Sequence, residues 1–370
     1  MSTWTLYGWE LSYFSAKLRA YLRLKDIPFA DRSVDAWTLM RTIPQKTGET
    51  VMPVLRSPAG EWLQDTTHII QRLEAQCPQQ PMIPGGPRQG LAARLIELWA
   101  DEFWLPTAMH YRWSYPGNWP LFEAEAGRSL LPWAPAFLQK KMAAKVASTL
   151  RGYLPSVGVL PEQFSLLEAW TEQQLDLLEK LLQQQPYLLG GAPSLADVAL
   201  IGPLYAHLGR DPEPKRLLIQ PRPALAAWIE RVHAGEKADG EWLPQDAIAP
   251  ALQTLLGGLL QEMLPWLRGI QAEVEKALPR ARSKGGRFPR ALGPVSCPMG
   301  EGVFRRQATP YSLWMMQGIR KEYMALPPEQ RQATAEFLEQ LGAPEALDEP
   351  FGPALQRAGL RVCLAEETSV

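Results

Sequence analysis

One hydroxyl group in this chain stands where the backbone itself favours chemistry. Residues 3–9 are typical of a short β-strand, and Phe14, Leu18 and Leu22 recur at the spacing of one helix face. Ser12 therefore lies where a strand passes into a helix, a place with unpaired backbone N–H groups and a positive helix dipole. Such a position binds anions and stabilises a thiolate or an alkoxide, but a serine there can also be a simple N-cap. This pattern alone leaves both interpretations of Ser12 open.

A proline interrupts the next strand-like run, at residues 51–55. Proline cannot donate a hydrogen bond within a sheet, and a cis peptide bond before Pro53 is one way to accommodate it. The backbone N–H and C=O of Met52 would then be free to pair with an extended peptide.

Polar residues precede the helix expected to begin near residue 66, in the order Gln64, Asp65, Thr66. A carboxylate can hold an ammonium group, while a hydroxyl and the N–H groups of a helix start can hold a carboxylate. A zwitterionic amino-acid end needs both kinds of partner. The segment therefore predicts a site for such a group, with a plain helix cap as the structural alternative.

The surrounding pattern predicts three regions. Residues 1–82 alternate strand, helix and strand, then a β-hairpin and a helix, and a proline- and glycine-rich linker follows. Residues 89–245 have only helical periodicity and predict an all-α region. Residues 246–370 predict a mostly helical extension, with helices over residues 248–278, 309–323 and 327–341.

Taken together, the ordered motifs resemble the glutathione S-transferase superfamily. Residues 12–19 resemble the family's Ser/Cys-Pro-Phe/Tyr-x-x-Lys/Arg-x-Arg motif, residues 51–55 its cis-proline segment, and residues 63–69 its Leu-x-Glu-Ser-x-Ala-Ile segment. Ser194 and Asp197 resemble the capping box of its helical domain. The resemblance covers residues 1–245, and the extension has no counterpart in an ordinary member.

The resemblance implies an α+β protein with a thioredoxin-like βαβ-ββα domain followed by an all-α domain. It also implies glutathione as co-substrate, activated as a thiolate for attack on an electrophilic, apolar small molecule. Ser12 would hydrogen-bond the sulfur. Because Tyr13 replaces the family's usual proline, Tyr13 or Ser15 could take that place instead. A serine rather than a cysteine favours conjugation over disulfide exchange, since serine forms no mixed disulfide.

By the same resemblance, Met52 and Pro53 would meet the cysteinyl backbone of glutathione. Gln64, Asp65 and Thr66 would hold its γ-glutamyl end, with Asp65 in place of the commoner glutamate. Lys46, with Gln45 beside it, could meet the glycyl carboxylate.

The composition narrows the classes of function that remain. The 370 residues carry a net charge of −1, which argues against general binding to nucleic acid or to membrane surfaces. No basic and apolar leader and no long apolar run is present, and the three cysteines have no metal-ligand spacing. We therefore expect a cytoplasmic protein without a metal site, and the family resemblance adds a possible homodimer.

Two alternatives stay open at this stage. The chain could be a glutathione-transferase-like binding or scaffold protein without turnover, whose C-terminal extension docks a partner or covers the cleft. The basic stretch from Arg280 to Arg290 is either a solvated loop or a site for an anionic ligand or partner.

Overall fold

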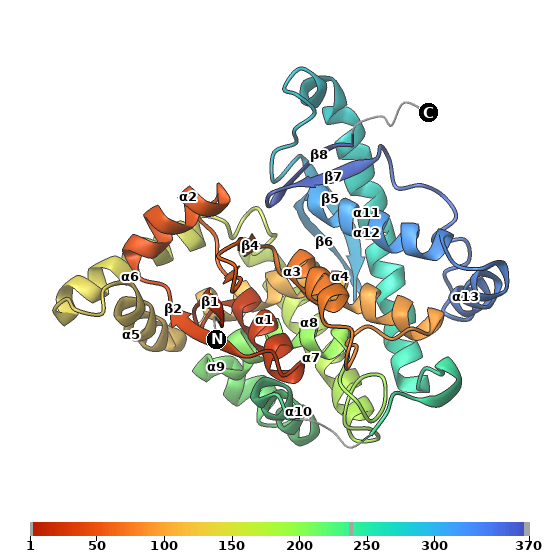
Figure 1. Cartoon of the computed structure of the whole chain (residues 1–370), viewed down its shortest axis with the longest axis horizontal. Coiled ribbons are helices and arrows are strands. Elements are labelled where there is room, and N and C mark those ends of the chain that lie inside the picture. The colour runs from red at the N-terminus through yellow and green to blue at the C-terminus, as the bar shows by residue number, and fades with distance from the viewer. Residues whose placement is uncertain (1–2, 237–239, 366–370) are drawn as a thin grey trace.

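The first region of the computed structural model, which describes residues 3–236 and 240–365, folds around a four-stranded sheet (Figure 1). Its elements are β1 (Trp4–Gly8), α1 (Tyr13–Leu24), β2 (Phe29–Ser33), α2 (Ile43–Thr47), β3 (Val54–Arg56), β4 (Trp62–Gln64) and α3 (Thr66–Gln76). The strand order is β2–β1–β3–β4, with β1 parallel to β2 and the other pairs antiparallel. This is the predicted thioredoxin-like βαβ-ββα arrangement.

Buried aliphatic residues hold this sheet to its helices. Leu6 and Leu55 pair across β1 and β3, and both are fully buried. Leu18 and Leu22 of α1 are fully buried in the same core, on the helix face that the sequence predicted. The sheet therefore fixes the places where β1 passes into α1 and β4 into α3.

The second region is helical, as predicted. Its helices are α4 (Pro87–Ser114), α5 (Trp119–Leu130), α6 (Ala136–Arg151), α7 (Phe164–Leu182), α8 (Leu195–Pro203), α9 (Pro212–Pro214) and α10 (Pro223–Ala234). Helices α5 and α6 form a hairpin on the left of Figure 1. The predicted capping box at the start of α8 is present, because the Ser194 N–H donates to Asp197 Oδ2 at 2.9 Å.

The C-terminal region contains the three predicted helices, α11 (Pro250–Arg282), α12 (Pro310–Met324) and α13 (Pro328–Gln340). Gly257, Gly258 and two prolines, Pro265 and Pro279, lie inside α11 without ending it. The region also has two antiparallel hairpins that the sequence did not predict. Strands β5 (Pro294–Met299) and β6 (Gly302–Gln307) lie between α11 and α12, and β7 (Leu355–Ala358) and β8 (Arg361–Leu364) follow α13.

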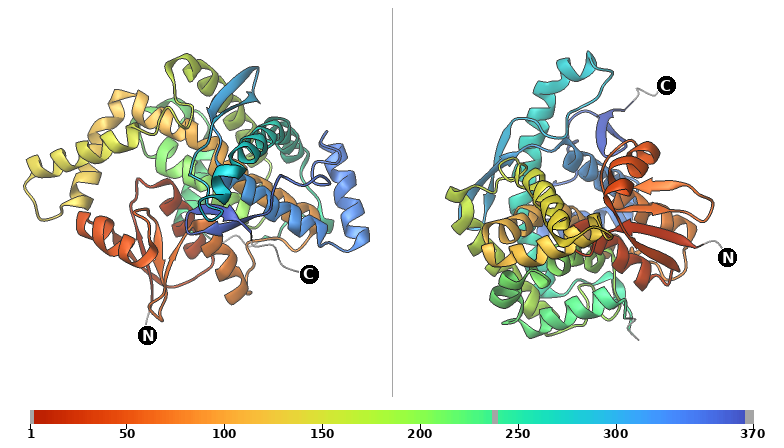
Figure 2. Two further views of the ribbon diagram at one scale, coloured as in Figure 1. Left: turned by 90° about the horizontal axis from the view of Figure 1, so that it is seen from above. Right: turned by 90° about the vertical axis from the view of Figure 1, so that its left-hand side faces the viewer.

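The C-terminal region shares one apolar core with the helical region. Trp266 of α11 is fully buried and meets the ring of Phe103 of α4 edge to face, 5.0 Å between centroids. Trp170 of α7 donates its indole N–H to Glu262 of α11 at 2.8 Å. Figure 2 shows the β5–β6 hairpin rising beside the segment that leads into α7, where the Gln307 N–H donates to the Ser156 carbonyl.

Candidate functional site

A cavity of about 300 Å³ lies where the first region meets the C-terminal region. The first region contributes Phe14 of α1, Met52 and Pro53, and residues 64–67 to its wall. Small-molecule sites typically start at about this volume. The proline segment and the segment before α3 thus line one cavity, whereas the segment around Ser12 contributes only Phe14.

The proline segment has the predicted form, since the Met52–Pro53 peptide bond is cis and β3 begins at the next residue. Gln64 holds the preceding loop by donating its side-chain amide to the carbonyls of Val51 at 2.7 Å and Glu49 at 3.3 Å. Within residues 3–236 and 240–365, no hydrogen bond involves the backbone of Met52. Its N–H and C=O are therefore available to an extended ligand.

Asp65 begins α3 and is engaged on both carboxylate oxygens. Its Oδ1 accepts from the N–H of His68 at 3.3 Å, which caps the helix. Its Oδ2 accepts from the hydroxyl of Tyr311 at 2.7 Å and lies 3.8 Å from the guanidinium of Arg357. The carboxylate expected to meet an ammonium group is thus held by the C-terminal region.

Tyr311 is a permanent donor in this contact. Burial, followed by the neighbouring negative charge of Asp65, raises the pKa of its hydroxyl well above the ordinary value. The phenol therefore keeps its proton at neutral pH. Thr66, next to Asp65, is buried at the first turn of α3 and lies in the cavity wall.

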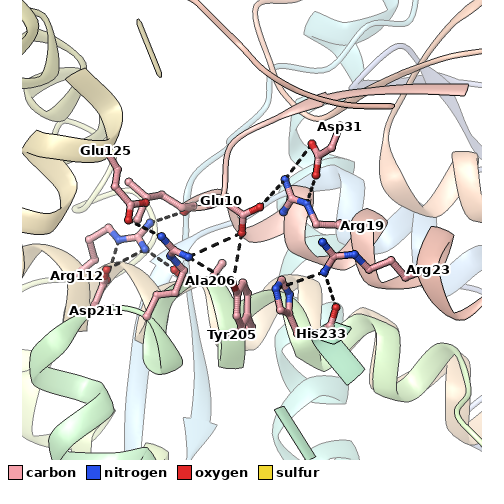
Figure 3. Close-up of polar contacts among 12 residues, drawn as sticks. Glu10, Arg19, Arg23, Asp31, Arg112, Glu125, Tyr205, Ala206, Asp211 and His233 are labelled. Atoms are coloured by element: carbon pink, nitrogen blue, oxygen red, sulfur yellow. Dashed lines mark hydrogen bonds and ion pairs between the residues drawn. The ribbon is translucent and has the colours of Figure 1, made fainter. Parts of the chain in front are cut away.

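Ser12 caps α1, as the sequence indicated. Its Oγ accepts from the N–H of Ser15 at 3.4 Å, and the residue is half-buried. Arg112 of α4 fixes the loop before it by donating to the Leu11 carbonyl at 2.6 Å. Figure 3 shows Arg112 facing Asp211, to which it donates at 2.8 and 3.1 Å. A buried ion pair thus sets the position of the α1 N-terminus.

The other two candidate hydroxyls have different surroundings. The Tyr13 hydroxyl donates to the Ala100 carbonyl of α4, and burial raises its pKa well above the ordinary value. The Ser15 Oγ is fully buried without a partner, and it lies so close to Gly8 that a Cβ there would come within 2.5 Å. Of the segment from Ser12 to Ser15, the cavity wall includes only Phe14.

The cations in the cavity wall differ from the one expected. Lys46 is exposed on α2 and does not belong to the wall. Arg290 and Arg361 of the C-terminal region do, and both pair with Glu49, at 3.0 and 3.1 Å. Sequence reasoning noted Arg290 only as part of a basic loop and did not single out Arg361.

A buried acid in the wall was also missed. Asp101 of α4 receives the Lys17 ammonium on Oδ2 at 2.6 Å, and its Oδ1 is buried without a partner. Lys17 also donates to Glu97 at 2.9 Å. Burial raises the pKa of Asp101 to about 7, although Lys17 opposes that shift. The signal in the sequence was a pair of acids, Glu97 and Asp101, four residues apart beside an apolar helix stripe.

A second cavity, of about 490 Å³, lies between the β1–α1 loop, β2 and α5. Figure 3 shows Arg19 of this cavity facing two acids, Asp31 at 2.5 Å and Glu10 at 3.3 Å. Arg210 pairs with Glu125. Because the negative charges of its acids balance the positive charges of its arginines, this cavity favours neither anions nor cations.

In the described part of the chain, no group of three or more metal-binding side chains is placed to hold an ion. No helix among the described residues has the length and apolar character to cross a membrane.

Two family models match the chain. Residues 6–81 match the N-terminal domain of glutathione S-transferase, and residues 171–231 match its C-terminal domain. Residues beyond 231 lie outside both matches. No curated protein sequence matches.

Several solved structures are similar over about two-thirds of the chain. A glutathione S-transferase from Methylobacterium radiotolerans in complex with glutathione sulfonate is 21% identical, with 67% of this chain and 100% of that chain covered and a TM-score of 0.40. FzlA from C. crescentus is 21% identical, with 68% and 97% covered and a TM-score of 0.39. The beta-etherase LigF from Sphingobium sp. strain SYK-6 is 21% identical, with 68% and 97% covered and a TM-score of 0.41.

Proposed function

Since the chain belongs to the glutathione S-transferase superfamily and carries both of its domains, we propose that it binds glutathione in the 300 Å³ cavity. The observation that carries this proposal is the shared wall: free backbone groups at Met52 lie beside Asp65 and Thr66 at the start of α3. An extended peptide pairs with the backbone of Met52. The amino-acid end of the same ligand takes Thr66 and the N–H groups of the helix start.

The proposed reaction is conjugation of glutathione to an apolar electrophile. The thiol gives its proton to water, and the thiolate sulfur forms a bond to an electrophilic carbon. The bond between that carbon and its leaving group breaks, and the leaving group departs with the electron pair. Ser12 lies outside the cavity wall, two residues before Phe14, so the sulfur has to extend past Phe14 to reach it. The Ser12 hydroxyl already accepts from the Ser15 N–H, which leaves its proton to donate to the thiolate. Each unit by which the thiol pKa falls corresponds to about 1.4 kcal/mol of preference for the thiolate.

Tyr13 and Ser15 are weaker partners for the sulfur than Ser12. The Tyr13 hydroxyl already donates a hydrogen bond to the Ala100 carbonyl, and Ser15 is fully buried next to Gly8. A cytoplasmic location and a homodimer belong to the same proposal, as expectations from the family.

Titration calorimetry with millimolar glutathione tests the binding step. Conjugation of glutathione to a chromogenic aryl halide tests the chemistry. We expect Ser12→Ala to lower the conjugation rate roughly 10- to 100-fold, the loss of about one to two pKa units. Tyr13→Phe is the control, because its hydroxyl faces α4. An unchanged rate in Ser12→Ala would reject Ser12 as the sulfur partner.

A second candidate function is binding without turnover. It is favoured by the engagement of Asp65 with Tyr311 and Arg357, which fills the acidic position from within the chain. Heat of binding without any conjugation, over a panel of electrophiles, would support this function. Absence of heat would reject the glutathione site itself.

A further inference from the structure

One end of the cavity carries an excess of positive charge. Glu49 follows α2, and its two carboxylate oxygens each receive one guanidinium: Oε2 from Arg290 at 3.0 Å and Oε1 from Arg361 at 3.1 Å. One carboxylate cannot neutralise two arginines, which stay charged at any physiological pH. The group therefore has a net charge of about +1.

Both arginines have N–H donors that Glu49 does not occupy. A guanidinium has five N–H donors in a planar fork that matches a carboxylate, and each of these two uses one nitrogen on Glu49. In the residues that the structure describes, neither side chain has a further hydrogen bond. Their side chains are 47% and 50% exposed, so the unused donors are accessible.

The two arginines belong to one structural unit. Arg290 lies between α11 and β5, and Arg361 begins β8. The N–H of Phe288 donates to the carbonyl of Val362 at 3.1 Å, next to both of them. Backbone pairing thus holds the two side chains on the same rim of the cavity, whose wall also includes Met52.

Acidic groups also lie in the cavity wall, each beside a cation. Asp65 is 3.8 Å from Arg357, and Asp101 receives the Lys17 ammonium at 2.6 Å while its Oδ1 is buried without a partner. The Asp65 carboxylate can accept from an ammonium group, whereas Arg290 and Arg361 can donate to a carboxylate. A ligand that carries both groups therefore fits the wall better than a simple anion.

We propose that Arg290 and Arg361 form a carboxylate subsite that takes the glycyl carboxylate of glutathione, in place of Lys46. This inference rests on the proposed function, because it assumes that the backbone of glutathione lies along Met52. Glu49 occupies the subsite partly and competes with the ligand for the same donors. The charge selectivity of the site is then supplied by residues beyond both family domains.

The experiment compares glutathione with its glycyl ethyl ester, which lacks this one negative charge. Calorimetry on the full chain is expected to show that the wild type binds glutathione about five- to tenfold more tightly than the ester. In the double variant Arg290→Ala and Arg361→Ala the preference should disappear, while the affinity for the ester stays unchanged. Arg287→Ala, an exposed arginine of the same loop outside the wall, is the matched control and should keep the preference.

Glu49→Gln gives a result of the opposite sign. Without the competing carboxylate, the affinity for glutathione should rise about threefold and that for the ester should not. A misfolded protein cannot produce this gain. If glutathione binds the wild type and the double variant keeps the preference, the inference is overturned and the proposed function survives. If the wild type binds neither compound, both are overturned.

Discussion

The two walls of the cavity present different kinds of chemical group. The wall from the first region presents backbone groups at Met52 and the N-terminus of α3, positioned by the four-stranded sheet. The wall from the C-terminal region presents side chains: the phenol of Tyr311 and the guanidiniums of Arg290 and Arg361. Backbone groups select an extended peptide of any composition, whereas guanidiniums select charge. Shape and charge recognition are therefore separable by mutation.

The walls meet at Asp65. Its Oδ1 belongs to the first wall as a helix cap, and its Oδ2 belongs to the second wall through Tyr311. A ligand ammonium can reach this carboxylate only by sharing it with the phenol. The contact between the two walls and the ammonium group of the proposed ligand therefore compete for the same acceptor.

The largest expected effect comes from detaching the second wall. Trp266→Ala removes a fully buried indole that packs on Phe103, and should lower the free energy of unfolding by about 3–5 kcal/mol. Urea unfolding followed by circular dichroism measures this loss. Trp133→Ala, at a side chain that is almost wholly exposed, should change stability by less than about 0.5 kcal/mol. Similar losses in both variants would contradict the shared core.

A smaller, pH-dependent effect is expected at Asp101, between the walls. Its pKa is raised to about 7 in the folded chain, so the folded carboxyl holds a proton that the unfolded one has lost above about pH 4. Stability of the wild type should fall as pH rises through this window, by at most about 1.4 kcal/mol per pH unit. Asp101→Asn removes this dependence, so its stability relative to the wild type should rise from pH 5 to 7.

Glu97 provides the control for that measurement. The Lys17 ammonium lowers the pKa of Glu97 despite its burial, so its stabilising contribution is lost only in acid, below its ordinary value of 4.5. The difference between Glu97→Gln and the wild type should therefore stay constant from pH 5 to 7. A constant difference for Asp101→Asn as well would show that Asp101 is ionised throughout.

The smallest expected change in stability tests the role of Asp65 as an acceptor. Tyr311→Phe deletes one hydrogen bond to a carboxylate and should cost about 1–2 kcal/mol of stability. Because it frees Oδ2, it should also raise the affinity for glutathione about threefold. Tyr323→Phe, on the same helix and with a longer contact of 3.4 Å to Asp348, is the control. Weaker binding in Tyr311→Phe would place the phenol among the groups that hold the ligand.

Local signals explain why the helix caps and the proline segment of the first region could be predicted. Ser12 and Asp65 cap helices through bonds to residues three positions away, and Met52–Pro53 is a dipeptide signal. Each depends on its sequence neighbours. The order of strands and helices along residues 1–82 followed from the same short-range pattern.

The second wall depends on contacts that no local pattern contains. In β5, Val295, Cys297 and Met299 alternate inward as in any half-buried strand, but proline, present at 294 and 298, is disfavoured within a strand. In β6 one of the two inward positions is taken by Arg306, whose charge is compensated by Glu102, some 200 residues earlier. A buried arginine reverses the expected hydrophobic alternation, so the hairpin was not predicted.

The bond between Tyr311 and Asp65 also has a temporal consequence. The two residues are 246 positions apart, and chains fold in units from the N-terminus during synthesis at about 5–20 residues per second. The sheet and α3 are therefore complete for roughly ten seconds or more before α12 leaves the ribosome. During that interval Asp65 Oδ2 lacks the Tyr311 hydroxyl and faces water, so the carboxylate of the helix cap exists before the contact that later covers it.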